Sequence, residues 1–278
     1  MIHYIGIRGH RGSGKNTISY LLGVSIDYYF KHNKSLEGFE ETFNAACNRV
    51  TLDEDFLKEA EFDKVYFEGF ADTPKILLSQ LIGIPSEWMW SDWKKDSVFI
   101  NMKDFSSHEC KDKLEVGAFL KQPNVFDSAD KFGEYMSLLS NGLGLKSGSY
   151  IIKNDCYLSL RELIIYFGKE VMQQKFGIDV WVKSLKSNDL DRDSFFAANK
   201  TMYKIFTDVK FPSEVSYIKD RKGFIIEVFR PSNVKEDTVL SYQLSDDRRV
   251  DFTIEIGDRL EDLRSQIESL TLKIINND

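Results

Sequence analysis

A glycine-rich segment near the start of the chain has the composition of a phosphate-binding loop. It reads Gly9-x-x-x-x-Gly14-Lys15, the Walker A spacing, and Asn16 and Thr17 follow the lysine. Glycines let a backbone turn tightly and approach an anion, and their N–H groups can point inward together. A lysine at the end of such a loop reaches the β- and γ-phosphates of a nucleotide as a mobile point charge. The spacing therefore predicts that the chain binds a nucleotide polyphosphate.

The flanking residues predict a strand before this loop and a helix after it. An apolar run over residues 2–8 precedes the loop, and an apolar helix over 15–30 follows it. This is the context that the motif requires, and the start of the helix adds about half a positive charge. We predict that the loop holds the phosphates of ATP through Gly9, Arg11, Gly12, Ser13, Gly14, Lys15, Asn16 and Thr17.

The residue after the lysine departs from the usual motif. Ser or Thr commonly stands there, and its hydroxyl binds Mg²⁺. Asn16 offers only a neutral amide oxygen at this position. Thr17 lies one residue further round the helix, where it can touch the α-phosphate or help to hold the metal.

Strands and helices alternate along most of the chain. Strands are predicted over 2–8, 64–70, 203–208, 223–229 and 251–256, and helices over 15–30, 73–82, 158–176, 179–187, 211–221 and 258–275. This alternation predicts an α/β fold with a five-stranded parallel sheet flanked by helices. Two stretches, 31–62 and 95–157, do not fit it. We interpret them as insertions in a single domain over 1–278, the second forming a lid or substrate lobe.

Charged side chains follow several predicted strands, at the sheet edge where ligands bind in parallel α/β folds. Asp72 and Lys75 follow the second strand, Asp208 and Lys210 the third, and Arg230 the fourth. A carboxylate after a buried strand is where phosphate-loop enzymes hold Mg²⁺, which favours this role for Asp208. The alternative for Asp72 is the N-cap of helix 73–82, and for Asp208 a cap of helix 211–221.

The predicted helix 158–176 carries an apolar stripe with charged residues beside it. The stripe consists of Leu160, Leu163, Ile164, Phe167 and Val171. Arg161 lies beside it and either contacts a phosphate or is a surface arginine paired with Glu162 or Glu40. Lys169 is a substrate contact or part of a salt-bridged helix face. For the tryptophans we favour packing over base stacking, at Trp88, Trp90, Trp93 and Trp181.

Taken in order, several segments resemble the bacteriophage deoxynucleoside monophosphate kinases. After the phosphate loop they are Phe70-Ala71-Asp72-Thr73-Pro74-Lys75, Leu158-Ser159-Leu160-Arg161-Glu162-Leu163, Phe167-Gly168-Lys169-Glu170, Asp179-Val180-Trp181-Val182, Thr207-Asp208-Val209-Lys210-Phe211-Pro212-Ser213-Glu214 and Val228-Phe229-Arg230-Pro231. The resemblance spans residue 2 to about 270 and is weak across 31–62 and 100–150. Among these segments only the loop is specific by itself. The other segments support the resemblance through their order along the chain.

This resemblance implies an adenylate-kinase-like P-loop fold and transfer of the ATP γ-phosphate to a deoxynucleoside monophosphate. It implies ATP and Mg²⁺ as cofactors, with Thr17 and Asp208 at the metal and Arg230 near the adenine or ribose. The catalytic set would be Lys15, Arg161, Asp208 and Lys210, and the acceptor would contact Asp72, Lys75, Arg161 and Lys169. Two residues depart from the family: Asn16 stands where Asp is typical, and Lys210 stands where Arg is typical, which replaces a planar fork with a point charge.

Composition narrows the classes of partner. Hydrophobic residues make up 42% of the 278 and charged residues 29%, which is typical of a soluble globular protein. The net charge of −7 disfavours a broad duplex-binding face, so we expect a small-molecule partner and not nucleic acid. No apolar run is long enough for a membrane span, and the phosphate loop begins too early for a secretion signal. Three widely separated cysteines fit a reducing compartment.

We therefore expect a protein of the cytoplasm of a phage-infected bacterium. A homodimer stays open, because dimers are common in the family. Two alternative functions also stay open. One is a phosphate-loop kinase acting on hydroxymethylated bases in phage DNA, and the other is a module that binds or hydrolyses ATP without an acceptor.

Overall fold

The computed structural model describes residues 1–10, 12–52, 56–57, 59–90, 94–95, 99–101, 149–152, 155–173, 176–185, 201–231, 249–257 and 259–276. The chain divides into two compact units. The core unit contains Met1–Phe70 and Trp181–Asp278, and the inserted unit contains Ala71–Val180.

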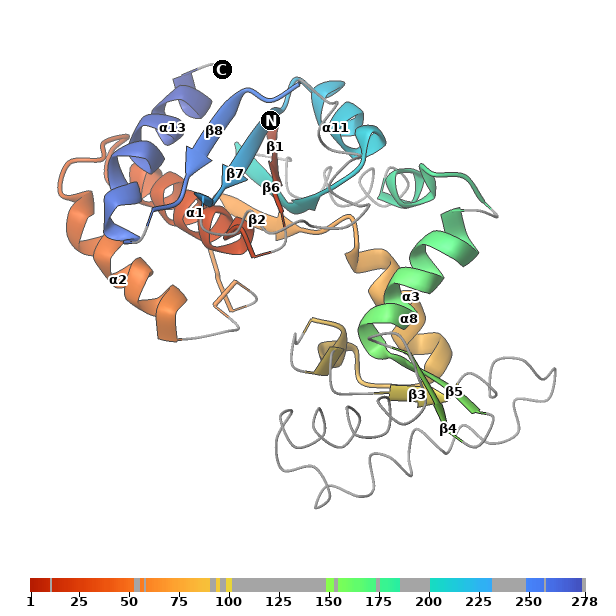
Figure 1. The fold of residues 1–278 in the computed structure, drawn as a ribbon. Coiled ribbons are helices and arrows are strands. Elements are labelled where there is room, and N and C mark those ends of the chain that lie inside the picture. The colour runs from red at the N-terminus through yellow and green to blue at the C-terminus, as the bar shows by residue number, and fades with distance from the viewer. Residues whose placement is uncertain are drawn as a thin grey trace. The chain divides into compact units, whose positions relative to one another are not determined.

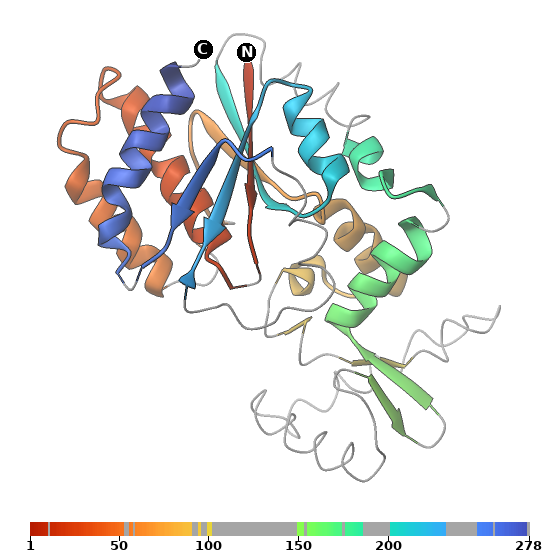
Figure 2. The ribbon, with the colours of Figure 1, turned by 45° about the horizontal axis from the view of Figure 1, so that its top comes forward.

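The core unit is built on a five-stranded sheet in which all neighbours are parallel (Figures 1 and 2). Its strand order is β2-β6-β1-β7-β8. The strands are β1 (Ile2–Arg8), β2 (Val65–Glu68), β6 (Met202–Val209), β7 (Phe224–Phe229) and β8 (Phe252–Glu255). The prediction of an α/β fold with a five-stranded parallel sheet is confirmed, and each strand end lies within two residues of its predicted position.

Helices cover both faces of this sheet. On one face lie α1 (Lys15–Lys31), α2 (Phe39–Leu52) and α13 (Arg264–Asn276), which the short turn η4 (Glu261–Leu263) precedes. On the other face lies α11 (Pro212–Lys219), as Figure 1 shows. Because side chains alternate along a strand, Ile5 and Ile7 of β1 pack toward α1, whereas Tyr4 packs toward α11.

Helix α1 is buried over most of its circumference. Its residues from Ile18 to Tyr29 are all buried, because α2 and α13 cover the sides that the sheet leaves open. A buried hydrogen bond of 2.9 Å from Thr271 Oγ1 to Ser25 Oγ joins α13 to α1. The helix that starts at the glycine loop is therefore held firmly along its length.

The predicted insertion over 31–62 contributes to this core. It contains α2, whose Phe39 and Phe43 are 1% and 0% exposed. Phe56, after the helix, is also buried and packs edge-on against Tyr20 of α1. The isolated aromatic residues of this polar stretch therefore form the buried side of α2 and of the turn that follows it.

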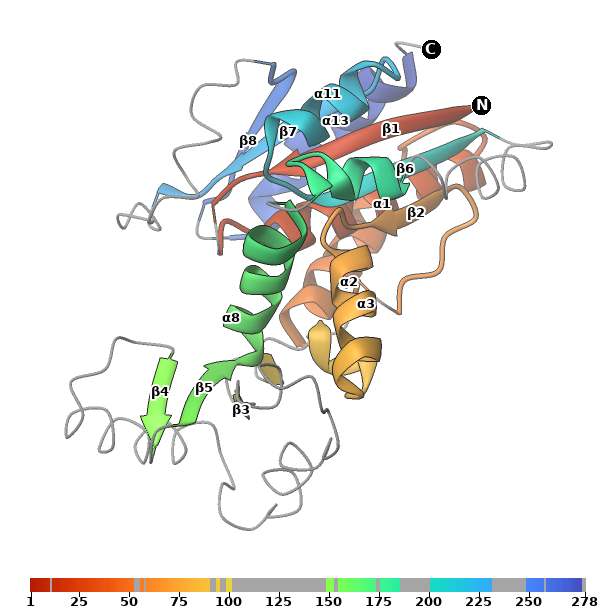
Figure 3. The same ribbon diagram turned by 90° about the vertical axis from the view of Figure 1, so that its right-hand side faces the viewer.

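The inserted unit combines two packed helices with a small antiparallel sheet of order β3-β5-β4. Its elements are α3 (Asp72–Ile82), η1 (Ser86–Met89), β3 (Phe99–Asn101), β4 (Ser149–Ile152), β5 (Asp155–Ser159), α8 (Leu160–Ile165) and the π-helical η2 (Tyr166–Gln173). Figure 3 shows α3 and α8 side by side, and they share an apolar cluster with Leu78, Ile82, Leu160 and Leu163.

The predicted helix 158–176 begins later than expected. Leu158 and Ser159 belong to β5, where they pair with Ile100 and Phe99 of β3, so the helix starts only at Leu160. It continues from Tyr166 as a π-helix. Its predicted stripe is confirmed at Leu160 and Leu163, which are buried, and at Ile164 and Phe167, which pack against them.

The described helices include none with the length and apolar character needed to cross a bilayer.

Candidate phosphate-binding site

The glycine loop lies at the carboxyl edge of the sheet, at the end of its middle strand. β1 pairs with β6 on one side and β7 on the other, and α1 begins directly after the loop. Within the loop, Ser13 N–H donates to His10 O at 3.1 Å, and Ile18 N–H then donates to Gly14 O at 3.0 Å. This is the edge at which parallel α/β sheets bind their ligands.

Two of the loop glycines are required by close approach. A Cβ on Gly9 would lie 2.4 Å from the backbone O of Val228 in β7 and 2.6 Å from Ser13 Oγ. Gly14 has a φ of +92°, and a Cβ there would lie 2.5 Å from Cδ1 of Ile256, just after β8. The loop is therefore packed directly against the strands on one side of β1, and side chains at these positions would push it away.

The start of α1 is arranged to attract an anion. Its N-cap is Gly14, and no side chain among the described residues caps the helix by a hydrogen bond. Its first turn carries no acidic residue. Lys15 Nζ donates to Gly9 O at 2.9 Å and to His10 O at 2.7 Å, so the ammonium group lies against the loop. The dipole of the helix start and this cation both favour negative charge at the same place.

Arg230 joins the loop from the end of β7. Its Nη2 lies 3.9 Å from the Cβ position of Gly14. Its Nε is buried and has no hydrogen-bond partner among the described residues. The structure thus brings this predicted donor-site residue to the loop, while the part of a nucleotide that it would contact stays a prediction.

Asp208 is held by the backbone at the end of β2. Its Oδ1 accepts a hydrogen bond of 2.8 Å from Phe70 N–H. The N-cap of α11 is Phe211, whose N–H donates to Glu214, so the alternative role of Asp208 as the cap of this helix is wrong. Asp208 instead joins the ends of β2 and β6 at the carboxyl edge.

Glu214 is a buried carboxyl group that anchors the neighbouring Lys210. Its Oε2 accepts N–H bonds from Lys210 at 2.6 Å and from Phe211 at 2.9 Å. Burial, and then the charge of Asp208, raise the pKa of Glu214 to about 8, against the opposing effect of these two bonds. The side chain of Lys210 is exposed, while its backbone is fixed.

Asp72 and Lys75 contact each other in the inserted unit. Lys75 Nζ lies 3.3 Å from Asp72 Oδ1, to which Trp90 Nε1 also donates at 3.1 Å. The ammonium of Lys75 lies 5.3 Å from the centroid of the Trp90 ring. The N-cap of α3 is Ala71, and Asp72 is the first residue of the helix, so the N-cap alternative for Asp72 is wrong.

Arg161 lies on α8 of the inserted unit and is partly exposed. Glu40, one of its two suggested partners, pairs instead with Arg264 at 2.8 Å.

Arg11 and the side chain of Lys169 lie outside the described residues. Because Arg161, Asp72 and Lys75 belong to the inserted unit, their roles at the loop stay predictions. Trp181 is buried, as its packing role predicted.

Sequence reasoning missed two ion pairs in the sheet. Arg8, the residue before Gly9, is 4% exposed and bonds to Glu227 Oε1 through Nη2 at 2.9 Å and Nε at 3.2 Å. Lys204 is fully buried, and its Nζ lies 2.6 Å from Glu68 Oε2. Charged residues within apolar strands were the available signal, because buried charges are nearly always paired.

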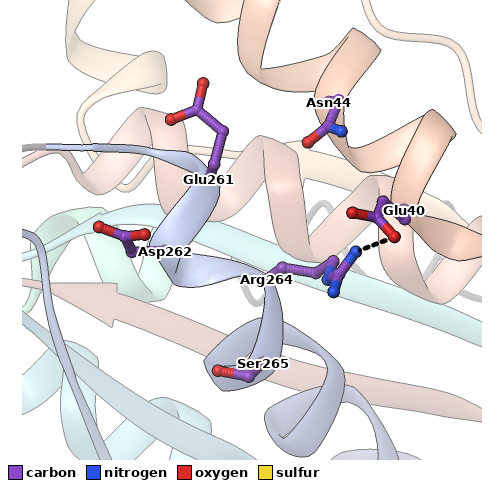
Figure 4. Close-up of a pocket in the computed structure, with 6 residues that line it drawn as sticks. All are labelled: Glu40, Asn44, Glu261, Asp262, Arg264 and Ser265. Atoms are coloured by element: carbon purple, nitrogen blue, oxygen red, sulfur yellow. Dashed lines mark ion pairs between the residues drawn. The ribbon is translucent and has the colours of Figure 1, made fainter.

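A separate polar hollow lies between α2 and the start of α13 (Figure 4). It has a volume of about 460 Å³ and is lined by Glu40, Asn44, Glu261, Asp262, Arg264 and Ser265. Figure 4 shows the ion pair between Arg264 and Glu40, which neutralises the cation of the hollow. The residues predicted for the phosphate site do not line it.

No protein-family model matches the chain, and no curated protein matches it.

Proposed function

We propose that the protein is a nucleotide kinase that transfers the γ-phosphate of ATP to a deoxynucleoside monophosphate. The observation that carries the proposal is the loop between β1 and α1. Gly9 and Gly14 pack it against neighbouring strands, and Lys15 lies across it, at the uncapped start of a long buried helix. This arrangement suits an anionic phosphate group, because the start of the helix and the ammonium of Lys15 both attract negative charge at the loop.

The donor phosphates would occupy the loop. Lys15 would exchange its contacts with the carbonyls of Gly9 and His10 for β- and γ-phosphate oxygens. Arg230, which lies beside Gly14, would add a second cation on the donor side. Backbone N–H groups of the loop would donate to the remaining phosphate oxygens, and these bonds would need no further side-chain movement.

Phosphoryl transfer requires alignment and charge neutralisation more than covalent catalysis. An oxygen of the acceptor phosphate attacks the γ-phosphorus in line, and the bond from that phosphorus to the bridging oxygen of ADP breaks. A phosphate monoester has a second pKa of about 6, so the acceptor is anionic at neutral pH and needs no strong base. By resemblance to the phage kinases, Arg161 and Lys210 neutralise the moving group, and Asp72, Lys75 and Lys169 contact the acceptor.

Mg²⁺ fits the donor atoms that this chain offers. The hydroxyl of Thr17 and the carboxylate of Asp208 are hard oxygen ligands of the kind that Mg²⁺ prefers, directly or through water. When bound, the ion would neutralise charge on the β- and γ-phosphates. The bond from Phe70 N–H to Asp208 Oδ1 keeps the carboxylate in place at the strand end.

The proposal is tested by ADP release with ATP and Mg²⁺ against a panel of ribo- and deoxynucleoside monophosphates. We expect at least one deoxynucleoside monophosphate to stimulate release, and Lys15→Ala to abolish turnover. Lys219→Met is the matched control. Lys219 Nζ lies 2.6 Å from Asp251 Oδ1, and this ion pair is not part of the loop. Absence of stimulation by every monophosphate would refute the proposal, as would full activity of Lys15→Ala.

A further inference from the structure

The ion pair between Arg8 and Glu227 lies directly beside the phosphate loop. The two residues are Cα partners in the pairing of β1 with β7. Arg8 immediately precedes Gly9, and Glu227 immediately precedes Val228, whose carbonyl lies against Gly9. The pair is therefore built from the two residues that precede Gly9 and Val228, where the loop lies close to the backbone of β7.

The two charges are unequally shielded from water. The side chain of Arg8 is 5% exposed and that of Glu227 is 39% exposed. Both lie on the face of the sheet toward α11, since they alternate with Ile7 and Val228, which pack on the other face. An arginine so deeply buried holds its carboxylate partner in one place, because guanidinium nitrogens bond in a rigid plane.

A carboxylate beside a polyphosphate site opposes binding unless it is neutralised. Two unit charges a few ångströms apart at a protein surface interact by roughly as much as a tenfold change in affinity or more. Glu227 without its partner would therefore weaken the attraction that the start of α1 and Lys15 exert on phosphate.

We infer that Arg8 acts as a positioning residue for the donor nucleotide by neutralising and holding Glu227. It does so through the carboxylate and without touching a phosphate. This inference rests on the proposed binding of ATP at the loop, and it adds to that site a charge-compensating pair in the underlying strands.

Titration of the protein with ATP and with inorganic tripolyphosphate tests the inference. Wild type and Lys15→Ala come first: binding lost in Lys15→Ala assigns the loop, whereas binding that survives contradicts the proposed donor site whatever Arg8 does. Arg8→Met is then expected to raise the Kd of both probes about tenfold, an effect that shrinks in high salt. By the same balance of charge, Glu227→Gln leaves the cation of Arg8 uncompensated and should lower the Kd of both probes; a raised Kd would contradict the inference.

The double variant Arg8→Met with Glu227→Gln decides the mechanism. We expect it to recover wild-type affinity, because it removes the repelling carboxylate together with its partner. If the double variant stays as weak as Arg8→Met, Arg8 contacts phosphate or the loop directly and the inference is overturned. An unchanged Kd in Arg8→Met would overturn it as well. Lys219→Met, which breaks a different ion pair of the core unit, should lose stability without losing affinity.

Discussion

At the scale of single residues, the loop depends on positions where no side chain fits. Gly9 and Gly14 both lack space for a Cβ, but the obstacles differ. At Gly9 the obstacle is the backbone of β7, which cannot move without disturbing the sheet. At Gly14 it is the end of the flexible Ile256 side chain, and both glycines have a positive φ, +154° at Gly9 and +92° at Gly14. Gly9 is therefore the less tolerant of the two.

Gly9→Ala is expected to destabilise the protein by about 1–3 kcal/mol, the usual range for overpacking, and to weaken ATP binding. Gly257→Ala is a matched control, because a Cβ on Gly257 meets nothing within 4 Å among the described atoms. Urea unfolding and an ATP titration measure the two effects. Equal stability of the two variants would show that the loop moves freely away from β7.

Asn16 is the residue of the loop that the chemistry explains least. It stands where Asp is typical of the phage kinases and where a hydroxyl residue is usual in the Walker A motif. Asn16→Asp adds a carboxylate to the first turn of α1 and is expected to change the Mg²⁺ concentration that gives half-maximal turnover. A Mg²⁺ titration of activity measures this. An unchanged curve would show that this side chain is out of reach of the metal.

Glu214 makes the stability of the core unit depend on pH. Its folded pKa of about 8 lies above the ordinary value of 4.5, so the folded state holds this proton more tightly than the unfolded state does. Its contribution is therefore complete below about pH 4.5 and is lost as pH rises toward 8. Glu214→Gln keeps an oxygen for the N–H groups of Lys210 and Phe211 and removes the titration. The stability of wild type relative to this variant should fall between pH 5 and pH 8, and parallel curves would contradict the assignment.

At the scale of elements, α2 belongs to the layer that packs against α1, the helix that begins at the glycine loop. Its sequence is polar, with isolated aromatic residues, so its hydrophobic face was not apparent as a core element. Phe39 and Phe43 of α2 are buried, and they belong to the same hydrophobic cluster as the buried residues of α1. Because α1 begins at the glycine loop, the packing of α2 against α1 helps to hold the loop in place.

Phe43→Ala should lower the free energy of unfolding by about 3–5 kcal/mol, as large-to-small changes do in a core. Leu52→Ala, at the end of the same helix, should change it little, because Leu52 is 86% exposed. Denaturant unfolding of both variants gives the comparison. A similar small loss in both would mean that α2 is not part of the core layer.

The parallel sheet was predictable because local signals define it. Runs rich in apolar residues, such as Met202–Phe206, indicate strands through residues that are neighbours in the sequence. The ion pair of Arg8 with Glu227 was not predictable from the sequence. It depends on the register between β1 and β7, and the two residues are 219 positions apart in the chain. The start of α8 was misplaced for a related reason: Leu158 has helical spacing with its neighbours, yet pairing with Ile100 draws it into β5.

At the scale of the whole molecule, the core unit is assembled from both ends of the chain. β1, α1 and β2 come from the first 70 residues, whereas β6, β7 and β8 follow residue 180. The predicted donor residues Lys15 and Arg230 therefore meet in one unit. The predicted acceptor residues Asp72, Lys75 and Arg161 all fall in the other.

The fate of the γ-phosphate tests the account most directly. The full chain is incubated with γ-labelled ATP, Mg²⁺ and either a deoxynucleoside monophosphate, DNA with hydroxymethylated bases, or no acceptor. We predict that the label appears in a deoxynucleoside diphosphate and that Lys15→Ala abolishes the transfer. Label found only in inorganic phosphate, or only in the DNA, would contradict the proposed function.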